Sequence, residues 1–457
     1  MNRLTRESAC PRCRPLLLAL ASAALLAACG GGGGGAADPG PATPQSCDAG
    51  PRKEALRAYF NEWYFWYRSS PSPAPSDAVS LDAYFNSLLY TGGDPTFPAD
   101  RWSYFDTTVN FNRFFGDGKA LGYGVFVAGQ EVTGRPDLPL YVRYIEPKSP
   151  AATAGVKRGD RIIAINGKPV AIVIANNDYA ALTPANEGET LTLQLSDRTV
   201  SVTAAIYELV PVTQASIVSS PSGRKAGYFV VKDMINQALT PVSDAMASFR
   251  AAGVTELVVD LRYNGGGLVT LGRDLASLVA GSRGTGRPYA SLLYNDKRAA
   301  SNNTTYSFTN PANGLGLSRV YILVGERTCS ASEQLAIGLK PIVDTVLVGR
   351  NTCGKPVGFL PHDDSCGNTY NVVNFESVNA SSEGRYFDGL KPTCAASEDW
   401  SKPLGSPTEP FLATALKHAD GGGCTAPAAV STQQRALSAR ERVLVNDGER
   451  PASMIQR

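Results

Sequence analysis

The chain has 457 residues, 43% of them hydrophobic, which is enough to build two or three folded domains with cores of their own. Its formal net charge is +2, but residues 1–28 alone carry +3, from Arg3, Arg6, Arg12 and Arg14 against Glu7, so the remainder has a net charge of −1. This balance gives no reason to expect nucleic-acid binding.

The N-terminal residues 1–28 have the pattern of an export signal. Arginines precede the apolar run PLLLALASAALLAAC, which ends at Cys29 and is too short for a membrane-spanning helix. Leu26-Ala27-Ala28-Cys29 resembles a lipobox, which implies a lipid anchor on Cys29; the alternative is an ordinary cleavage site. Because glycine rather than aspartate follows the cysteine, the resemblance implies an exported protein anchored to the outer membrane and facing the periplasm.

Residues 29–46 are rich in glycine and proline and are predicted to form a flexible tether. The Cys-x-x-C formed by Cys10 and Cys13 lies in the removed signal and is discarded as a metal or redox motif. Six cysteines follow Cys29, and an even number in an exported protein indicates disulfides. They are Cys47, Cys329, Cys353, Cys366, Cys394 and Cys424. The sequence alone does not choose their pairing.

Residues 47–116 are predicted to form a small helical domain. KEALRAYFNEWYFWYR and SLDAYFNSLLY repeat large apolar residues at helical spacing. An aromatic stripe of this kind is usually helix packing rather than a ligand site.

Residues 117–207 contain short strand patterns, GYGVFVA, LPLYVRYIE and DRIIAINGKPV, with SPAATAGVKRGD between the last two. This order resembles a PDZ domain, a family that captures a chain terminus by adding it to a sheet edge. The resemblance implies a carboxylate-binding loop at Leu121, Gly122, Tyr123 and Gly124. A plain hairpin turn is the alternative for these four residues.

Residues 208–425 alternate strand and helix patterns, with continuous apolar strands such as ELVVDLR and RVYILVG. This alternation predicts a buried, largely parallel sheet whose chemistry lies at the carboxyl ends of its strands. Three loops, RYNGGG, ERTCS and RNTCGK, are expected at that edge. Residues 426–457 are charged, carry no strong pattern, and are predicted to be a helical or loose tail.

The stretch GERTCSASEQLAIGL places Ser330 at a strand-to-helix corner, where many enzymes carry a nucleophilic serine. A serine needs a base, and the chain has two histidines, His362 and His418. Lys355, at the end of a neighbouring strand, is the better candidate if burial lowers its pKa, because only a neutral amine accepts a proton. Lys340 lies ten residues along the helix from Ser330, too far for this role.

The order of strand, SASE, helix, strand and GK resembles the carboxyl-terminal processing, or tail-specific, protease family. That family joins a helical N-terminal part, a PDZ domain and a core with a Ser–Lys dyad, and its DLRxNxGG segment is matched at 260–267. The resemblance implies Ser330 as nucleophile and Lys355 as general base. It also implies oxyanion donors from Ala331 and from Gly266 or Gly267, and a supporting role for Glu333.

Taken together, these patterns predict a multidomain α/β protein. It would have a small N-terminal helical domain, a PDZ-like β-rich domain and an α/β protease core with a largely parallel sheet. Its function would be that of a serine endopeptidase acting on exported proteins or peptides with free, apolar C-terminal ends. No zinc-site spacing or phosphate-binding loop is present, and we expect no cofactor.

Two positions depart from the family pattern. Many members have a glutamine four residues past the lysine to orient it, whereas this chain has Phe359. Asn351, His362 or Asp363 could orient Lys355 instead, and the sequence does not decide among them. Pro341 replaces a residue that is often acidic in the family.

Three alternatives compete with this interpretation. The chain could be a catalytically inactive lipoprotein that binds peptides through its PDZ domain. It could be a penicillin-recognising or esterase-type enzyme using Ser222-Gly223-Arg224-Lys225, although this S-x-x-K lies in a turn and no K-T-G follows. It could also use His362 or His418 as the base.

Cys329 and Cys353 each follow an apolar strand and stand next to the predicted catalytic residues. If the two strands are neighbours, the cysteines leave one sheet edge about 5 Å apart, within the usual span of a disulfide. We therefore predict a Cys329–Cys353 bond that joins the two loops. Pairing of either cysteine with Cys366 or another partner remains open at this stage.

Overall fold

The computed structural model describes residues 43–129, 131–424 and 443–456. The predicted signal, Cys29 and most of the tether lie outside these residues and stay predictions. Within the described ranges, no helix is long and apolar enough to cross a membrane.

The N-terminal part is helical, as predicted from its aromatic spacing. It contains α1 (Ala49–Trp63), η1 (Pro75–Asp77), α2 (Leu81–Ser87), β1 (Tyr104–Thr107) and α3 (Thr108–Phe115). Its buried aromatic residues do not form a separate core, because they belong to one hydrophobic cluster with the strands and helices of residues 208–425. Helices this short cannot cover an aromatic stripe alone, so they pack on the larger part.

The PDZ-like part has a core of its own, built from residues such as Val127, Leu140 and Leu193. Five strands form a sheet in the order β3-β4-β5-β7-β8, β6 pairs with β5, and β2 pairs with β9. The elements are β2 (Lys119–Gly122), β3 (Val125–Ala128), β4 (Leu140–Ile145), α4 (Pro150–Thr153), β5 (Arg161–Ile165), β6 (Lys168–Pro169), α5 (Val170–Ala175), η2 (Ala180–Leu182), β7 (Thr190–Leu195), β8 (Thr199–Thr203) and β9 (Ala205–Glu208).

The main sheet of the third part runs in the order β10-β11-β12-β16-β17-β22, and every pair except β10–β11 is parallel. This confirms the largely parallel sheet predicted from the apolar strands. The strands are β10 (Val212–Ser219), β11 (Lys225–Val231), β12 (Glu256–Asp260), β16 (Arg319–Val324), β17 (Asp344–Gly349) and β22 (Cys394–Ala395).

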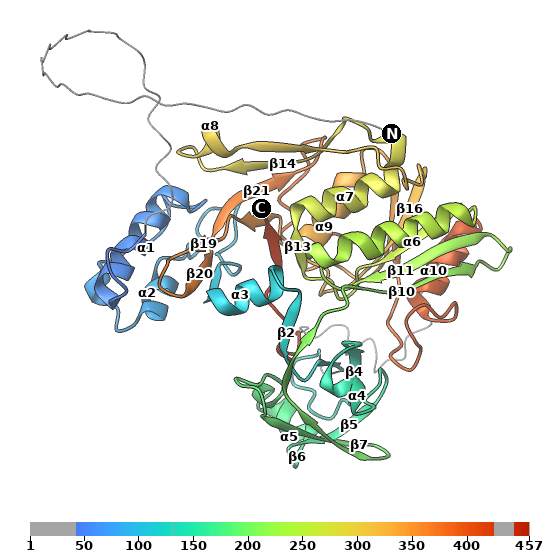
Figure 1. The fold of residues 1–457 in the computed structure, drawn as a ribbon, viewed down its shortest axis with the longest axis horizontal. Helices are drawn as coiled ribbons and strands as arrows, with labels where there is room; N and C mark the ends of the chain where they lie inside the picture. The colour runs from blue at the N-terminus through green and yellow to red at the C-terminus, as the bar shows by residue number, and fades with distance from the viewer. Residues whose placement is uncertain (1–42, 130, 425–442, 457) are drawn as a thin grey trace, which may run out of the picture. The chain divides into compact units, whose positions relative to one another are not determined.

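Helices cover both faces of this sheet (Figure 1). Alternate strand residues pack against α6 (Leu239–Ala251), α7 (Val269–Ala280) and α9 (Ala331–Leu339) on one face and against α10 (Pro410–Ala419) on the other. Both faces are therefore apolar, which is why the strands read as continuous hydrophobic runs.

A second sheet, of mixed direction and not predicted from the sequence, runs in the order β13-β23-β18-β21-β14-β15. A small sheet, β1-β20-β19, joins it to the N-terminal part. The remaining elements are η3 (Asn236–Ala238), β13 (Gly266–Leu268), η4 (Gly281–Arg283), β14 (Pro288–Tyr294), α8 (Ala299–Asn302), β15 (Thr304–Ser307), β18 (Val357–Phe359), β19 (His362–Asp363), β20 (Asn368–Asn371), β21 (Val373–Val378) and β23 (Ser453–Ile455).

The prediction of a helical or loose C-terminal tail is wrong for residues 443–456. Most of this segment is irregular, with a bend at residues 447–448, and its last residues form β23, which pairs with β13 and with β18. A strand of three residues has no periodicity that a sequence pattern could reveal.

Candidate active site

Ser330 lies at the corner between β16 and α9, in the residue that precedes the first turn of the helix. Its backbone has φ 61° and ψ −117°, a conformation that costs energy for any residue with a side chain. The residue is fully buried, and its hydroxyl oxygen has no hydrogen-bond partner among the described residues. A strained serine on a strand-to-helix corner fits the geometry of a nucleophile.

Lys355 lies six residues beyond β17, the strand next to β16, and is almost completely buried. Burial lowers the pKa of Lys355 well below its usual value, and the carboxylates of Asp100 and Glu333 offset this only in part. The side-chain nitrogen Nζ of Lys355 lies 3.9 Å from the centre of the Phe359 ring. It donates a hydrogen bond to the carbonyl oxygen of Ala452, in the C-terminal segment, rather than meeting the Ser330 hydroxyl.

The loops that carry Ser330 and Lys355 are joined covalently. Cys329 and Cys353 form a disulfide with their Cα atoms 5.2 Å apart, as predicted from their positions after neighbouring strands. The other pairs are Cys47–Cys366 and Cys394–Cys424.

Glu333 joins the same loops a second time. Its carboxylate accepts hydrogen bonds from the backbone N–H groups of Ser330 at 2.8 Å, Gly354 at 2.8 Å and Lys355 at 2.9 Å, and from the Thr352 hydroxyl. Burial raises the pKa of Glu333, and these hydrogen bonds oppose the rise. The side chain is fully buried, so it is not the solvent-exposed charge that is common at helix N-termini.

The glycines of the 260–267 motif lie beside the serine corner. A Cβ atom built on Gly266 would come within 2.9 Å of the backbone nitrogen of Ala331, so the glycine is what permits this approach. However, the Gly266 N–H donates to the side-chain oxygen of Asn264 at 2.7 Å. Gly267 is therefore the better of the two predicted glycine donors.

Buried charges fix the start of this motif, a feature that sequence reasoning missed. Arg262 forms ion pairs with Asp260 and with Glu409, at the start of α10, and all three side chains are buried. Asn264 links the motif to its neighbours. Its side-chain amide donates to the Val231 carbonyl, and its backbone carbonyl accepts a hydrogen bond from the Ser332 hydroxyl. The glycine strand is thus attached to the serine helix. No sequence signal pointed to Glu409, which lies 147 residues from Arg262.

The predicted carboxylate-binding loop lines a cavity of about 660 Å³. Residues Leu121 to Gly124 and Gly265 to Gly267 both form part of its wall. Gly124 has φ +74°, and a side chain there would clash with Ser149, so the turn requires glycine. The cavity links the PDZ-like part to the predicted oxyanion donors.

The two histidines contact residues other than Ser330. His362 stacks on Tyr59 with ring centres 4.5 Å apart, and His418 Nδ1 is 3.1 Å from the Tyr321 hydroxyl. Neither hydrogen-bonds the Ser330 hydroxyl. The alternative S-x-x-K motif lies in the turn between β10 and β11, where Ser222 is exposed and bonded to Asp420, as expected for a surface loop.

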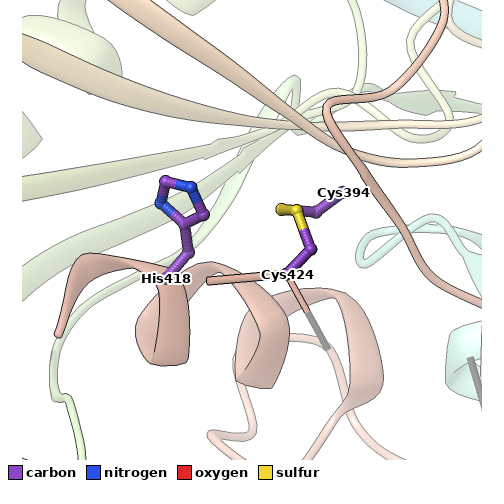
Figure 2. A group of neighbouring side chains, drawn as sticks. All are labelled: Cys394, His418 and Cys424. Carbon is purple, nitrogen blue, oxygen red and sulfur yellow. A yellow bond between two sulfur atoms is a disulfide. The ribbon is translucent and has the colours of Figure 1, made fainter. Parts of the chain in front are cut away.

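Among the residues that the structure describes, two groups of side chains have metal-ligand chemistry, but their sulfur atoms are used in disulfides. Cys394, His418 and Cys424 lie close together (Figure 2), and Cys329, Glu333 and Cys353 form the second group. In each group the two cysteines are bonded to each other, so neither offers a thiolate ligand.

Three family profiles match the chain in the order of its parts. The Peptidase S41 N-terminal domain matches residues 53–104, a PDZ domain matches 141–195, and Peptidase family S41 matches 225–394. The chain therefore carries the two domains of peptidase family S41, with a PDZ domain between them. The S41 match contains both Ser330 and Lys355, together with the glycine motif.

Relatives agree with this assignment. The chain is 29% identical to carboxyl-terminal-processing peptidase 3, chloroplastic, of Arabidopsis thaliana over 60% of this chain and 53% of that protein. It is 28% identical to a carboxyl-terminal-processing protease of a Picosynechococcus strain over 50% of this chain and 55% of that protein. The chain thus spans about half the length of these curated relatives.

A solved structure from Bacteroides fragilis, titled as an S41 protease, has 27% identity and a TM-score of 0.64. It covers 80% of this chain and 97% of its own. The fold described above is therefore shared with this structure over most of the chain.

Proposed function

We propose that this S41 chain is a serine endopeptidase of the carboxyl-terminal processing type, with Ser330 as nucleophile and Lys355 as general base. The observation that supports it most is the buried lysine on the loop next to the serine, joined to it by Cys329–Cys353 and Glu333. A lysine with its pKa lowered by burial can be neutral near physiological pH, which a base must be.

In this mechanism, the neutral Lys355 amine takes the hydroxyl proton of Ser330 as the serine oxygen attacks the substrate carbonyl carbon. The resulting ammonium then gives its proton to the leaving amine, and the acyl group stays on Ser330. Water, deprotonated by the same lysine, releases the acyl group and restores the serine.

The oxyanion of each tetrahedral intermediate would be stabilised by the backbone N–H groups of Ala331 and Gly267. Ala331 begins α9, where the helix dipole also favours negative charge. Loss of one such donor typically costs about 10²–10³ in rate. Glu333 is a positioning residue here, because it contacts backbone groups of both loops and not the reacting atoms.

Substrates would be exported proteins or peptides with a free carboxylate and apolar last residues, selected by the PDZ domain at Leu121, Gly122, Tyr123 and Gly124. The cavity that runs from these residues to the catalytic glycines supports this assignment. An extended chain that enters it would reach both surfaces.

We also propose that the protein is exported and anchored to the outer membrane through Cys29, facing the periplasm. The three disulfides among the described residues favour an oxidising compartment. The parts would be the signal (1–28), tether (29–46), helical domain (47–116), PDZ domain (117–207), protease core (208–425) and tail (426–457). A Cys29→Ser variant should lose fatty-acid labelling and appear in the soluble periplasmic fraction.

The activity is tested with a panel of unfolded proteins that differ only in their last few residues. Cleavage should favour apolar ends, weaken when the terminal carboxylate is amidated, and vanish in Ser330→Ala. Cleavage that persists in Ser330→Ala would disprove the mechanism, and equal cleavage of free and amidated ends would remove the PDZ domain as selector.

A further inference from the structure

The C-terminal segment, residues 443–456, occupies the position that an extended substrate needs. Its strand β23 lies between β13, which carries the catalytic glycines, and β18, which follows Lys355. It runs parallel to both. Without β23, these two strands would have a gap between them, with Ser330 and Lys355 at its wall.

The segment contacts the atoms that would carry out catalysis. The Lys355 amine donates to the carbonyl of Ala452, and the Ser453 N–H donates to the carbonyl of Gly265 at 2.9 Å. The Ser453 carbonyl oxygen lies directly against Gly266, on the side where Ala331 N is also close. Backbone carbonyls of the segment therefore stand where the base and the oxyanion donors would meet a substrate.

This occupancy explains the disengaged serine. The Lys355 amine makes its hydrogen bond to Ala452, and the buried Ser330 hydroxyl has no partner among the described residues. A buried polar group without a partner costs free energy. The serine is thus left without a base while the segment is bound.

The earlier part of the segment packs against the PDZ-like part. Val445 is buried in the PDZ hydrophobic cluster, and Asp447 accepts a hydrogen bond from the Val127 N–H at 2.7 Å. Residues 446–451 and Ser453 form part of the wall of the cavity that links the PDZ loop to the glycines. One segment thus contacts the PDZ-like part and the glycine strand, and it lines the cavity that the proposed function assigns to substrates.

Ion pairs hold the segment between these two surfaces. Glu449 pairs with Arg143 of the PDZ domain at 2.6 Å and with Lys232 and Arg327 of the core at 2.9 and 3.2 Å. Asp447 pairs with Arg143 as well. The carboxylates are supplied by the segment and the cations by the enzyme, so the contact is complementary in charge.

We propose that residues 443–456 are an intramolecular inhibitor that lies in the substrate cleft as a strand between β13 and β18 and takes the hydrogen bond of the catalytic lysine. This inference rests on the proposed protease function. Because one peptide strand at a time fits between β13 and β18, a substrate has to displace the segment before it is cleaved. Substrate strands should bind in the same, parallel direction.

The test uses the full chain with a recognition sequence for a specific protease inserted within residues 425–442, so that the tail is cut after folding. Cleavage of an unfolded substrate is measured before the cut, after the cut and removal of the tail, and after adding a synthetic peptide of residues 443–457. The matched control peptide carries Ser453→Pro, which lacks the N–H that bonds Gly265. A Ser330→Ala version of the protein is carried through every step.

Release of the tail should raise the cleavage rate at least tenfold, and the peptide should restore inhibition at least tenfold more strongly than the proline peptide. In the uncut full chain, Ser453→Pro should also raise activity. Equal rates before and after release, with no effect of the peptide, would overturn the inference while leaving the proposed function intact. Loss of both the folded state and the activity on release would show that β23 is a structural strand, which also overturns it.

A binding measurement separates this inference from the proposed function. A fluorescent peptide of residues 443–457 should bind the released Ser330→Ala protein and be displaced by unfolded substrate. If no form of the protein cleaves any substrate, the protease assignment fails, and this binding still decides whether the segment belongs in the cleft. Absence of peptide binding would reject the inhibitor whatever the activity.

Discussion

The loops that carry Ser330 and Lys355 and the C-terminal segment meet at the same atoms but are held in different ways. The loops are joined by a disulfide between Cys329 and Cys353 and by the buried carboxylate of Glu333, which accepts backbone hydrogen bonds from both. The segment is held without covalent bonds, by a three-residue strand, by the buried side chains of Met454 and Ile455, and by ion pairs of Asp447 and Glu449. The first arrangement suits a site that must keep one geometry, and the second suits a part that must leave.

The largest expected effect is loss of the dyad. Ser330→Ala or Lys355→Ala should lower cleavage on the order of 10⁶-fold, as removal of the nucleophile does in characterised serine proteases. Lys355→Arg should fail as well, because arginine stays charged and cannot act as a base. Rates are measured on the intact or tail-released form, whichever is more active. Substantial proteolysis by Lys355→Arg would reject lysine as the base.

The next effect tests the oxyanion donors. Gly267→Ala introduces a side chain at φ +139°, close to the Met234 backbone, and should lower kcat by about 10²–10³-fold by displacing the donor N–H. Gly265→Ala is the matched control, because its nearest contact would be an ordinary 3.6 Å from the Ala452 Cα. Equal losses in the two variants, with unchanged thermal unfolding, would remove Gly267 from the mechanism.

The covalent tie between the loops is tested by comparing two disulfides of similar span. Cys329 and Cys353 are 24 residues apart, and Cys394 and Cys424 are 30 apart. Removing either bond by double substitution to alanine should lower the free energy of unfolding by about 3 kcal/mol. Only loss of Cys329–Cys353 should also lower kcat, by up to about 10²-fold, because it lets the two catalytic groups shift. Equal kcat in the two variants would mean that Glu333 alone keeps the geometry.

The sequence was most informative where patterns are local or long. The parallel sheet followed from continuous apolar strands, and the Cys329–Cys353 bond followed from two cysteines at the ends of neighbouring strands. The aromatic helices were also predicted correctly, although their shared core with the protease part was not. Periodicity shows which face of a helix is buried but not what covers that face.

The remaining features depend on contacts between distant residues, and no local pattern reveals these. Glu449 meets Arg143 across 306 residues, and Glu409 meets Arg262 across 147. The second sheet contains strands as short as three residues, among them β13 and β23. Glu333 was predicted in a supporting role, but its bonds to the lysine loop could be found only from the fold.

The pH dependence of cleavage should report the buried lysine. Only the neutral amine is a base, so the rate should rise about tenfold per pH unit up to the folded pKa of Lys355 and then level off. Burial lowers this pKa, so the folded protein releases the proton at lower pH than the unfolded chain does. Lys355 therefore lowers the free energy of unfolding at low pH. This loss shrinks as the pH rises from the folded pKa of Lys355 to its pKa in the unfolded chain.

A substitution of Phe359 tests whether burial is what lowers the pKa of Lys355. Its ring lies 3.9 Å from the lysine Nζ, where it excludes water. Phe359→Ala should admit water, raise the pKa of Lys355 and move the rise in rate to higher pH. Phe308→Ala, which removes a buried ring that packs on Tyr289, is the control for general loosening of the core. A profile that moves equally in both variants would show that the ring is not what lowers the pKa.

The smallest expected effect concerns the contact that holds the segment in place. Although burial opposes it, the ion pairs with Arg143, Lys232 and Arg327 keep the pKa of Glu449 well below its usual value, so the side chain is charged throughout the physiological range. Glu449→Gln removes that charge, while Arg143 keeps Asp447 and Lys232 keeps Asp233 as partners. The segment should lose about 1.5 kcal/mol of binding free energy, the cost of a charged hydrogen bond, which corresponds to roughly a tenfold rise in the activity of the intact protein.

Two controls accompany this variant. The tail-released protein no longer contains residue 449, so the substitution should leave its rate unchanged. Glu208→Gln, at an exposed ion pair with Lys148, should change neither form. Because the rigid loops are the same in all these proteins, a rise confined to the intact Glu449→Gln protein would assign the change to release of the segment, whereas a fall in its activity would show that the ion pairs support the active geometry and not the inhibited one.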